Sequence, residues 1–161
     1  MNTRKIVLLS LLTTIALTIF VIEAQIPPVV PFPGIKPGLS NIITLVTLVW
    51  FGRKEAFIVL LLRIFLGNIF AGQAISFIYS FTGGIFSYII ISALFAILKN
   101  QPWVLSVFGA VFHNIGQIAA AIIITGVREI AGYFMILMIS AIITGAFTGL
   151  TAERLTKHIH I

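Results

Sequence analysis

Three hydrogen-bonding side chains, His113, Asn114 and Gln117, lie in a part of the sequence that is otherwise almost entirely apolar. The run from Val104 to Thr125 is long enough to cross a bilayer and contains no charged residue. On a helix, His113 and Gln117 share one face, with Asn114 beside them. Polar groups at this depth are costly unless they meet partners, water or a ligand. The pattern therefore predicts a membrane helix that lines a binding cavity, and the alternative is a cluster of hydrogen bonds between helices.

Arg63 is the strongest single signal, because it places a cation near the middle of an apolar segment. A charged side chain at the bilayer centre costs about 2.5–3.5 kcal/mol on insertion scales, so it faces the interior of a bundle and is paired. Two kinds of partner remain open, an anionic ligand or a structural partner. Glu23 qualifies as the structural partner only if the proline-rich segment that follows it folds inward.

The composition indicates a membrane protein. The hydrophobic fraction is 60%, only 9% of residues are charged, and the mean hydropathy is +1.17. Charged residues in soluble domains run at about 25%. The net charge of +6 arises from basic residues at segment ends, which is typical of membrane topology signals and not of nucleic-acid binding. Cysteine is absent, and the sequence contains no metal-ligand pair, nucleophile–base pair or nucleotide-binding loop, so we expect no cofactor and no enzyme activity.

The apolar runs predict one all-α, polytopic membrane domain. Its six helices are expected at about residues 6–22, 39–51, 57–71, 77–98, 104–125 and 131–150. The first run is long for a signal peptide and is interpreted as a retained first helix. The second run would form only about 20 Å of helix, against a hydrocarbon core of about 30 Å, so it either extends further or begins below the membrane surface.

Residues 23–38 contain five of the six prolines and are not expected to be helical. Ile26, Phe32 and Ile35 make the same segment apolar. An apolar segment stiffened by proline is expected to pack onto the bundle, where it can cap a cavity.

The basic residues predict the orientation of the chain. Six spans place both termini on one side of the membrane. That side would hold seven basic residues: Arg4, Lys5, Arg53, Lys54, Lys99, Arg154 and Lys157. The other side would hold Lys36 and Arg128. By the positive-inside rule we expect a multi-pass protein of the cell membrane with both termini in the cytoplasm and the proline-rich segment outside.

With this orientation the polar side chains converge on a cavity that opens outward. Arg63 and His113 fall near the midplane, and Asn41, Ser87 and Gln117 fall in the outer halves of their helices. The predicted binding residues are Glu23, Lys36, Asn41, Arg63, Ser87, His113, Asn114 and Gln117. Gly83 and Gly84 serve either close helix packing or close approach of a ligand.

Two faces of small residues are candidates for contact with another membrane protein. Ser10, Thr14 and Thr18 follow one another at four-residue spacing in the first helix, and Gly145 and Gly149 do so in the last. Small residues let a neighbouring helix approach closely, and packing drives association within lipid. We expect one of these faces to contact a partner.

Several parts of the chain together resemble one family. These are Glu23, residues 33–42, Arg63, residues 79–87 and residues 109–117. The family is known as heptaprenyl diphosphate synthase component I, or the Gx transporter family, and it is similar to the substrate-binding S components of energy-coupling factor transporters. S components are small six-helix membrane proteins, so the resemblance implies a substrate-binding bundle of six helices that works with an energising module. Where the family pattern tends to have leucine, this chain has Pro37.

The two family names imply different functions. Prenyl diphosphate synthases hold magnesium diphosphate with aspartate-rich motifs, because magnesium prefers hard oxygen ligands. This chain has no aspartate and only four scattered glutamates, so it is not expected to be the catalytic subunit. We expect a protein for small-molecule binding and uptake. Its ligand would carry an anionic or strongly accepting group and an aromatic or isoprenoid part, as vitamins and quinone precursors do. The alternative is a membrane subunit of a quinone-linked, flavin-linked or prenyl-lipid system.

Overall fold

The computed structural model describes residues 3–26, 36, 38–72 and 74–159, and every element in them is helical. The elements are α1 (Thr3–Glu23), α2 (Asn41–Phe51), α3 (Arg53–Ala71), α4 (Ala74–Leu98), α5 (Pro102–Thr125), the short 3₁₀ helix η1 (Arg128–Tyr133) and α6 (Phe134–His158). The six predicted α-helices are therefore present, and most extend a few residues beyond the predicted ends. The prediction of a cap over residues 23–38 falls mainly on 27–35 and 37, which lie outside the described residues.

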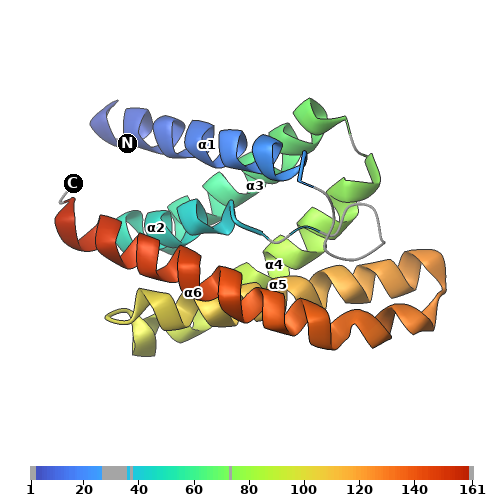
Figure 1. The fold of residues 1–161 in the computed structure, drawn as a ribbon. Helices are drawn as coiled ribbons and strands as arrows, with labels where there is room; N and C mark the ends of the chain where they lie inside the picture. The colour runs from blue at the N-terminus through green and yellow to red at the C-terminus, as the bar shows by residue number, and fades with distance from the viewer. Residues whose placement is uncertain (1–2, 27–35, 37, 73, 160–161) are drawn as a thin grey trace.

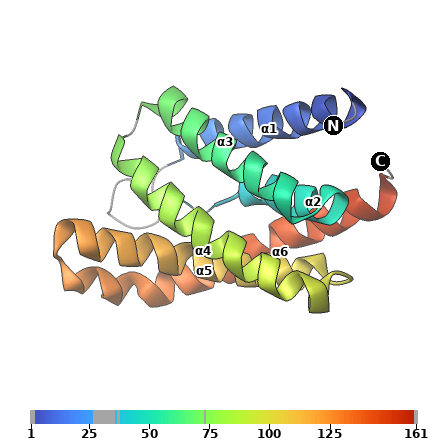
Figure 2. The same ribbon diagram turned by 180° about the vertical axis from the view of Figure 1, so that it is seen from behind.

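The helices form two groups around α2. Helices α4, α5 and α6 pack side by side, and α1 and α3 lie together on the other side (Figures 1 and 2). Helix α2 contacts each of the other five α-helices. The shortest helix is thus the central one, and its residues from Ile43 to Leu48 are all buried.

Four stretches are long and apolar enough to cross a membrane. Within the part of the chain that the structure describes, these stretches are Thr3–Glu23, Ile75–Leu98, Pro102–Thr125 and Arg128–His158. Helix α2 has 11 residues, which corresponds to about 16 Å of helix, and α3 carries four charged side chains. The prediction of a short second helix is confirmed, and α2 begins inside the bundle beside side chains from the middle of α3 and α5.

Gly52 joins α2 to α3 in a sharp turn, with a φ of +94° that a residue with a Cβ rarely adopts. The turn places α3 antiparallel to α2 (Figure 2). Arg63, halfway along α3, therefore returns to the N-terminal end of α2.

Glycines bring the backbones of α4, α5 and α6 into direct contact. A Cβ on Gly83 of α4 would lie 2.8 Å from the carbonyl oxygen of His113, and one on Gly116 of α5 would lie 2.8 Å from the carbonyl oxygen of Thr82. A Cβ on Gly149 of α6 would lie 2.5 Å from the Cα of Trp103. Separations below 3.0 Å leave no room for a side chain. These glycines therefore serve helix packing.

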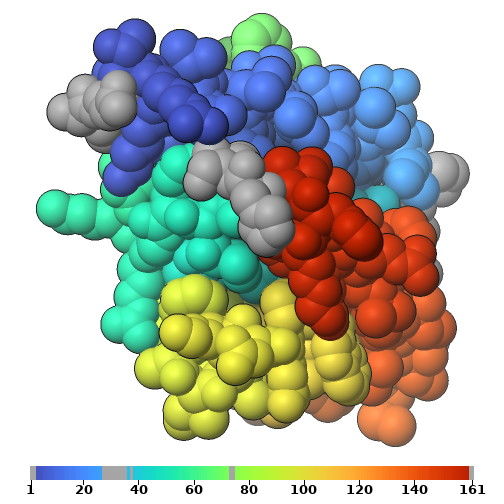
Figure 3. Space-filling view, turned by 90° about the vertical axis from the view of Figure 1, so that its left-hand side faces the viewer, coloured from blue at the N-terminus to red at the C-terminus, as the bar shows by residue number. Residues whose placement is uncertain are grey.

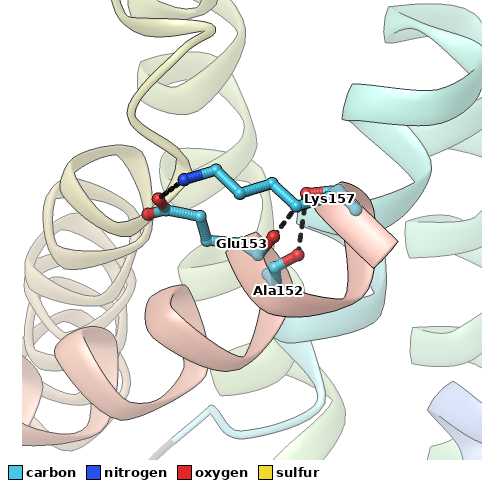
Figure 4. A network of polar contacts seen from close by, with 4 residues as sticks. Ala152, Glu153 and Lys157 are labelled. Carbon is cyan, nitrogen blue, oxygen red and sulfur yellow. Dashed lines mark hydrogen bonds and ion pairs between the residues drawn. The ribbon is translucent and has the colours of Figure 1, made fainter. Parts of the chain in front are cut away.

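Most of the basic residues gather at one end of the bundle. Figure 3 looks onto this end, where α1 begins, α6 ends, and the α2–α3 and α4–α5 connections lie. An ion pair between Lys5 and Glu55 joins the first turns of α1 and α3. Close to the end of α6, Glu153 pairs with Lys157 at 2.5 Å, as Figure 4 shows. The seven basic residues predicted to share one side thus lie at one end of the structure.

We expect this end to face the cytoplasm. The α4–α5 connection, which contains Lys99, lies at this end, and η1, which begins at Arg128, lies at the opposite end (Figure 1). Both residues are exposed, and each can be replaced singly by cysteine. The wild-type chain has no cysteine, so it serves as an unlabelled background. In intact cells an impermeant thiol reagent should label Arg128→Cys, and should label Lys99→Cys only after lysis. Labelling of Lys99→Cys from outside would overturn the orientation.

Candidate functional site

The carboxylate of Glu23 holds the N-terminal end of α2. Glu23 ends α1, is 2% exposed, and accepts hydrogen bonds from the backbone N–H groups of Gly38, Leu39 (2.9 Å) and Ser40 (3.4 Å). The hydroxyl of Ser40 donates to the same carboxylate at 3.3 Å. The first N–H groups of a helix have no partner within the helix and form its positive end, which favours an anion there. The end of this segment that precedes α2 is therefore buried against Glu23, whereas Gln25 and Ile26, just after α1, are exposed.

Arg63 binds the same turn from the side of α3. It is 2% exposed, and its guanidinium donates to the hydroxyl of Ser40 and, at 2.9 Å, to the Oδ1 of Asn41. The Ser40 hydroxyl thus connects the arginine to Glu23. Of the two partners that the sequence left open for Arg63, the structural one is present, through Ser40 and Asn41.

A cavity under this turn brings together five of the predicted residues. It is lined by Glu23, Lys36, Arg63, His113 and Gln117, together with Phe20, Gly38, Ser40 and Ser80. These residues come from α1, the segment before α2, α3, α4 and α5. Side chains that are far apart in the sequence thus meet at one point in the interior.

Four side chains at this cavity, Lys36, Arg63, His113 and Gln117, each have a buried nitrogen without a hydrogen-bond partner among the described residues. Gln117 is 0% exposed, and neither its amide nitrogen nor its amide oxygen has a partner among the residues described. The same holds for the Nζ of Lys36, which is 7% exposed. Leaving a buried donor or acceptor unpaired costs about 1–3 kcal/mol. Groups left unpaired in this way are available to a buried water molecule or to a ligand.

An aromatic ring supports the cations. The Nζ of Lys36 lies 4.2 Å from the ring centroid of Phe20, and the Cζ of Arg63 lies 5.9 Å from it. The ring fits against Gly67 of α3, where a Cβ would lie 2.5 Å from a ring carbon. Cation–π contact stabilises the ammonium group by about 0.5–2 kcal/mol without using its hydrogen-bond donors.

The pKa of Lys36 reflects its surroundings. Burial lowers this pKa below its usual value, nearby Arg63 lowers it further, and the Glu23 carboxylate opposes both by raising it. An additional anion beside Lys36 would raise the pKa in the same way as Glu23 does.

His113 lies beside Gly38, the residue that this cavity shares with a second one. Its ring packs against Gly38, where a Cβ would lie 3.0 Å from Cδ2, and its Nδ1 has no partner with hydrogen-bond geometry in the described part of the chain. The second cavity begins at Gly38 and runs between α2, α4, α5 and α6. Its lining includes Asn41 and Ser87, as well as the hydroxyl groups of Thr44, Ser106, Thr144 and Thr148. Seven of the eight predicted binding residues therefore line one of two adjoining cavities.

Asn114 is the exception. It is buried, and its Nδ2 donates to the backbone carbonyl of Leu137 in α6 at 2.7 Å. It lines neither of the two cavities described above. Its described contact joins α5 to α6, which corresponds to the helix–helix alternative that the sequence left open.

Sequence analysis missed Ser40 and Phe20. Ser40 is of the residue type favoured immediately before a helix, so its place ahead of the second apolar run was a usable signal. Phe20 is one aromatic residue in an apolar helix, and no pattern in the sequence distinguishes it.

The family model described as heptaprenyl diphosphate synthase component I matches residues 12–155 of the chain. The matched range contains all the residues that line the two cavities. No curated protein and no solved structure matches the chain.

Removal of the Asn114 side chain should affect stability and spare ligand binding. Asn114→Ala removes one buried hydrogen bond, which is worth about 0.6 kcal/mol on average between membrane helices. We expect the melting temperature in detergent to fall by a few degrees, while the amount of any co-purifying small molecule stays unchanged. Asn100→Ala, at an exposed position between α4 and α5, is the control and should melt like wild type. Unchanged stability with loss of the co-purifying molecule would assign Asn114 to the ligand instead.

Proposed function

The chain belongs to the heptaprenyl diphosphate synthase component I family, and on that premise we propose that it binds a small molecule in the cavity under the α2 turn and takes part in its uptake. The observation that carries the proposal is the pair of buried, unpartnered side chains at this cavity, Lys36 and Gln117, judged over the described residues. Other buried polar atoms without a partner lie elsewhere in the described part of the chain, but here such atoms from several elements meet at one cavity, and that convergence favours a ligand.

The donor groups favour a ligand with an anionic or strongly accepting group. Lys36 offers an ammonium group, and Gln117 offers an amide donor beside an amide acceptor. Phe20 and the apolar residues Leu45, Leu60 and Ile91 of the second cavity favour an aromatic or isoprenoid part. A vitamin-like ring, a flavin or a quinone precursor combines both features.

Both cavities are narrow, so a ring-sized ligand requires movement of the covering turn. Gly38, with a φ of +81°, lies where the two cavities meet. In the proposed orientation this turn faces the outer half of the membrane. Displacement of the turn would open the cavity to the outside.

Uptake against a gradient would need a separate energising partner, because the sequence contains no ATP-binding loop. Of the two candidate contact faces, Gly145 and Gly149 pack against α5 within the chain. Ser10, Thr14 and Thr18 are exposed on α1. We therefore place the partner contact on α1.

An accessory membrane subunit is the second candidate function. The family description as component I of a synthase favours a partner subunit, and the lack of aspartate argues against a catalytic role for this chain. In this case the cavity would hold a prenyl lipid, a quinone or a flavin without transport.

The experiment that tests the function is mass spectrometry of molecules that co-purify with the protein in mild detergent. A polar, vitamin-like molecule would support uptake, whereas a prenyl quinone or lipid would support the accessory role. Lys36→Gln and Gln117→Leu should each reduce the amount bound, because a hydrogen bond to a charged group contributes about 1.5–3 kcal/mol, or roughly 10–100-fold in affinity. Lys157→Gln, at the other end of the bundle, is the matched control. If all variants bind the molecule as well as wild type does, the ligand does not bind in this cavity.

Bulky residues on the exposed face of α1 should release the partner. Ser10→Trp and Thr14→Trp lengthen two short side chains that allow close helix contact. We expect each variant to lose proteins that co-purify with wild type from native membranes. Ile97→Trp, on α4 at a position 81% exposed, should retain them. Identical co-purification by all four proteins would contradict a contact through α1.

A further inference from the structure

The charged groups at the cavity do not balance one another. Two cations, Lys36 and Arg63, and one carboxylate, Glu23, line it. The only other titratable side chain in its lining, judged over the described residues, is His113. A third positive charge beside two buried cations is strongly disfavoured, so the imidazole counts as neutral. The cavity therefore holds one positive charge in excess.

The carboxylate of Glu23 is already fully engaged. It receives three backbone N–H groups and one hydroxyl from residues 38–40, and that hydroxyl also binds Arg63. Both of its oxygens are used within the turn. Arg63 and the N-terminal end of α2 are thus neutralised together by one internal anion.

The excess charge lies on Lys36. Its Nζ rests over the face of Phe20, an arrangement that favours the charged form, and it has no hydrogen-bond partner among the described residues. Gln117 lines the same cavity, and its amide N–H group has no hydrogen-bond partner among the residues that the structure describes. A buried cation without a counter-ion in an apolar environment destabilises the folded state unless an anion binds beside it.

We propose that the ligand is a monoanion with one carboxylate-like group, which binds to Lys36 and Gln117 while Glu23 remains in place as the counter-ion of Arg63. This rests on the proposed binding function and narrows the ligand class. One negative charge brings the cavity to neutrality. A phosphate monoester or a diphosphate brings two or more charges and leaves uncompensated negative charge close to the Glu23 carboxylate, which is repulsive.

Benzoate and phenyl phosphate provide a matched test, because they share one ring and differ in charge. At pH 8 benzoate is a monoanion and phenyl phosphate is mostly a dianion, since the second pKa of a phosphate monoester is about 6. Binding is measured on the full chain in detergent, as the rise in melting temperature with increasing probe concentration. Wild type should be stabilised by benzoate, and should bind phenyl phosphate at least about tenfold more weakly.

Charge variants make the test specific to the cavity. Lys36→Gln removes the excess charge and should weaken benzoate binding by about tenfold or more. Glu23→Gln raises the excess from one positive charge to two. It should therefore shift the preference from benzoate toward the dianion phenyl phosphate. If Glu23→Gln does not fold, Lys36→Gln and Lys36→Arg carry the test, because Lys36→Arg keeps the charge and should keep the preference for benzoate. Lys157→Gln is the control outside the cavity.

If wild type binds phenyl phosphate more strongly than benzoate, or binds neither probe, the proposal of a monoanionic ligand is wrong. Unchanged benzoate binding in Lys36→Gln would overturn it as well. The proposed function is judged separately by the co-purification experiment. If a neutral or multiply charged molecule co-purifies and is lost in Gln117→Leu, the monoanion fails while the binding function stands.

Discussion

The arrangement of the first three helices depends on the burial of one carboxylate. Glu23 is charged and almost completely covered, so the chain must surround it with donors. It does so with the backbone N–H groups of the turn at residues 38–40. The hydroxyl group of Ser40, in the same turn, also accepts a hydrogen bond from Arg63. This single network ties the end of α1, the beginning of α2 and the middle of α3 together. It also explains why α2 begins inside the bundle, because a positive helix end can be stabilised there by an internal anion.

The other three helices supply a rigid wall against which this network packs. Gly83, Gly116 and Gly149 allow the backbones of α4, α5 and α6 to touch, so these helices leave little freedom for relative movement. His113 and Gln117 project from that wall toward the α2 turn. One side of the cavity is therefore fixed by close packing, and the other side is held by hydrogen bonds to a short turn. The opening that we propose would move the turn while the wall stays in place.

Buried polar residues have two roles in this bundle, to join helices or to line the cavity. Asn114 donates through its amide nitrogen to α6 although its Oδ1 has no partner, whereas Lys36 and Gln117 make no side-chain hydrogen bond at all among the residues that the structure describes. It is at these two side chains that we propose a ligand binds, because an unpaired polar group in an apolar interior is costly. The description of the family as component I of a synthase suggests an accessory subunit.

The sequence by itself determined the number of helices, the grouping of basic residues at one end, and seven of the residues that line the cavities. It could do so because long apolar runs and isolated polar residues in a membrane have few alternative interpretations. Sequence alone could not decide which polar residues bind one another. Arg63 reaches Ser40 and Asn41 because Gly52 reverses the chain, and Asn114 faces Leu137 because of how α5 packs on α6. Those pairings depend on the relative placement of helices distant in the chain, which local periodicity does not encode. For the same reason Lys36 and Gln117 could be identified as unpaired only after the tertiary structure had brought their potential partners into view.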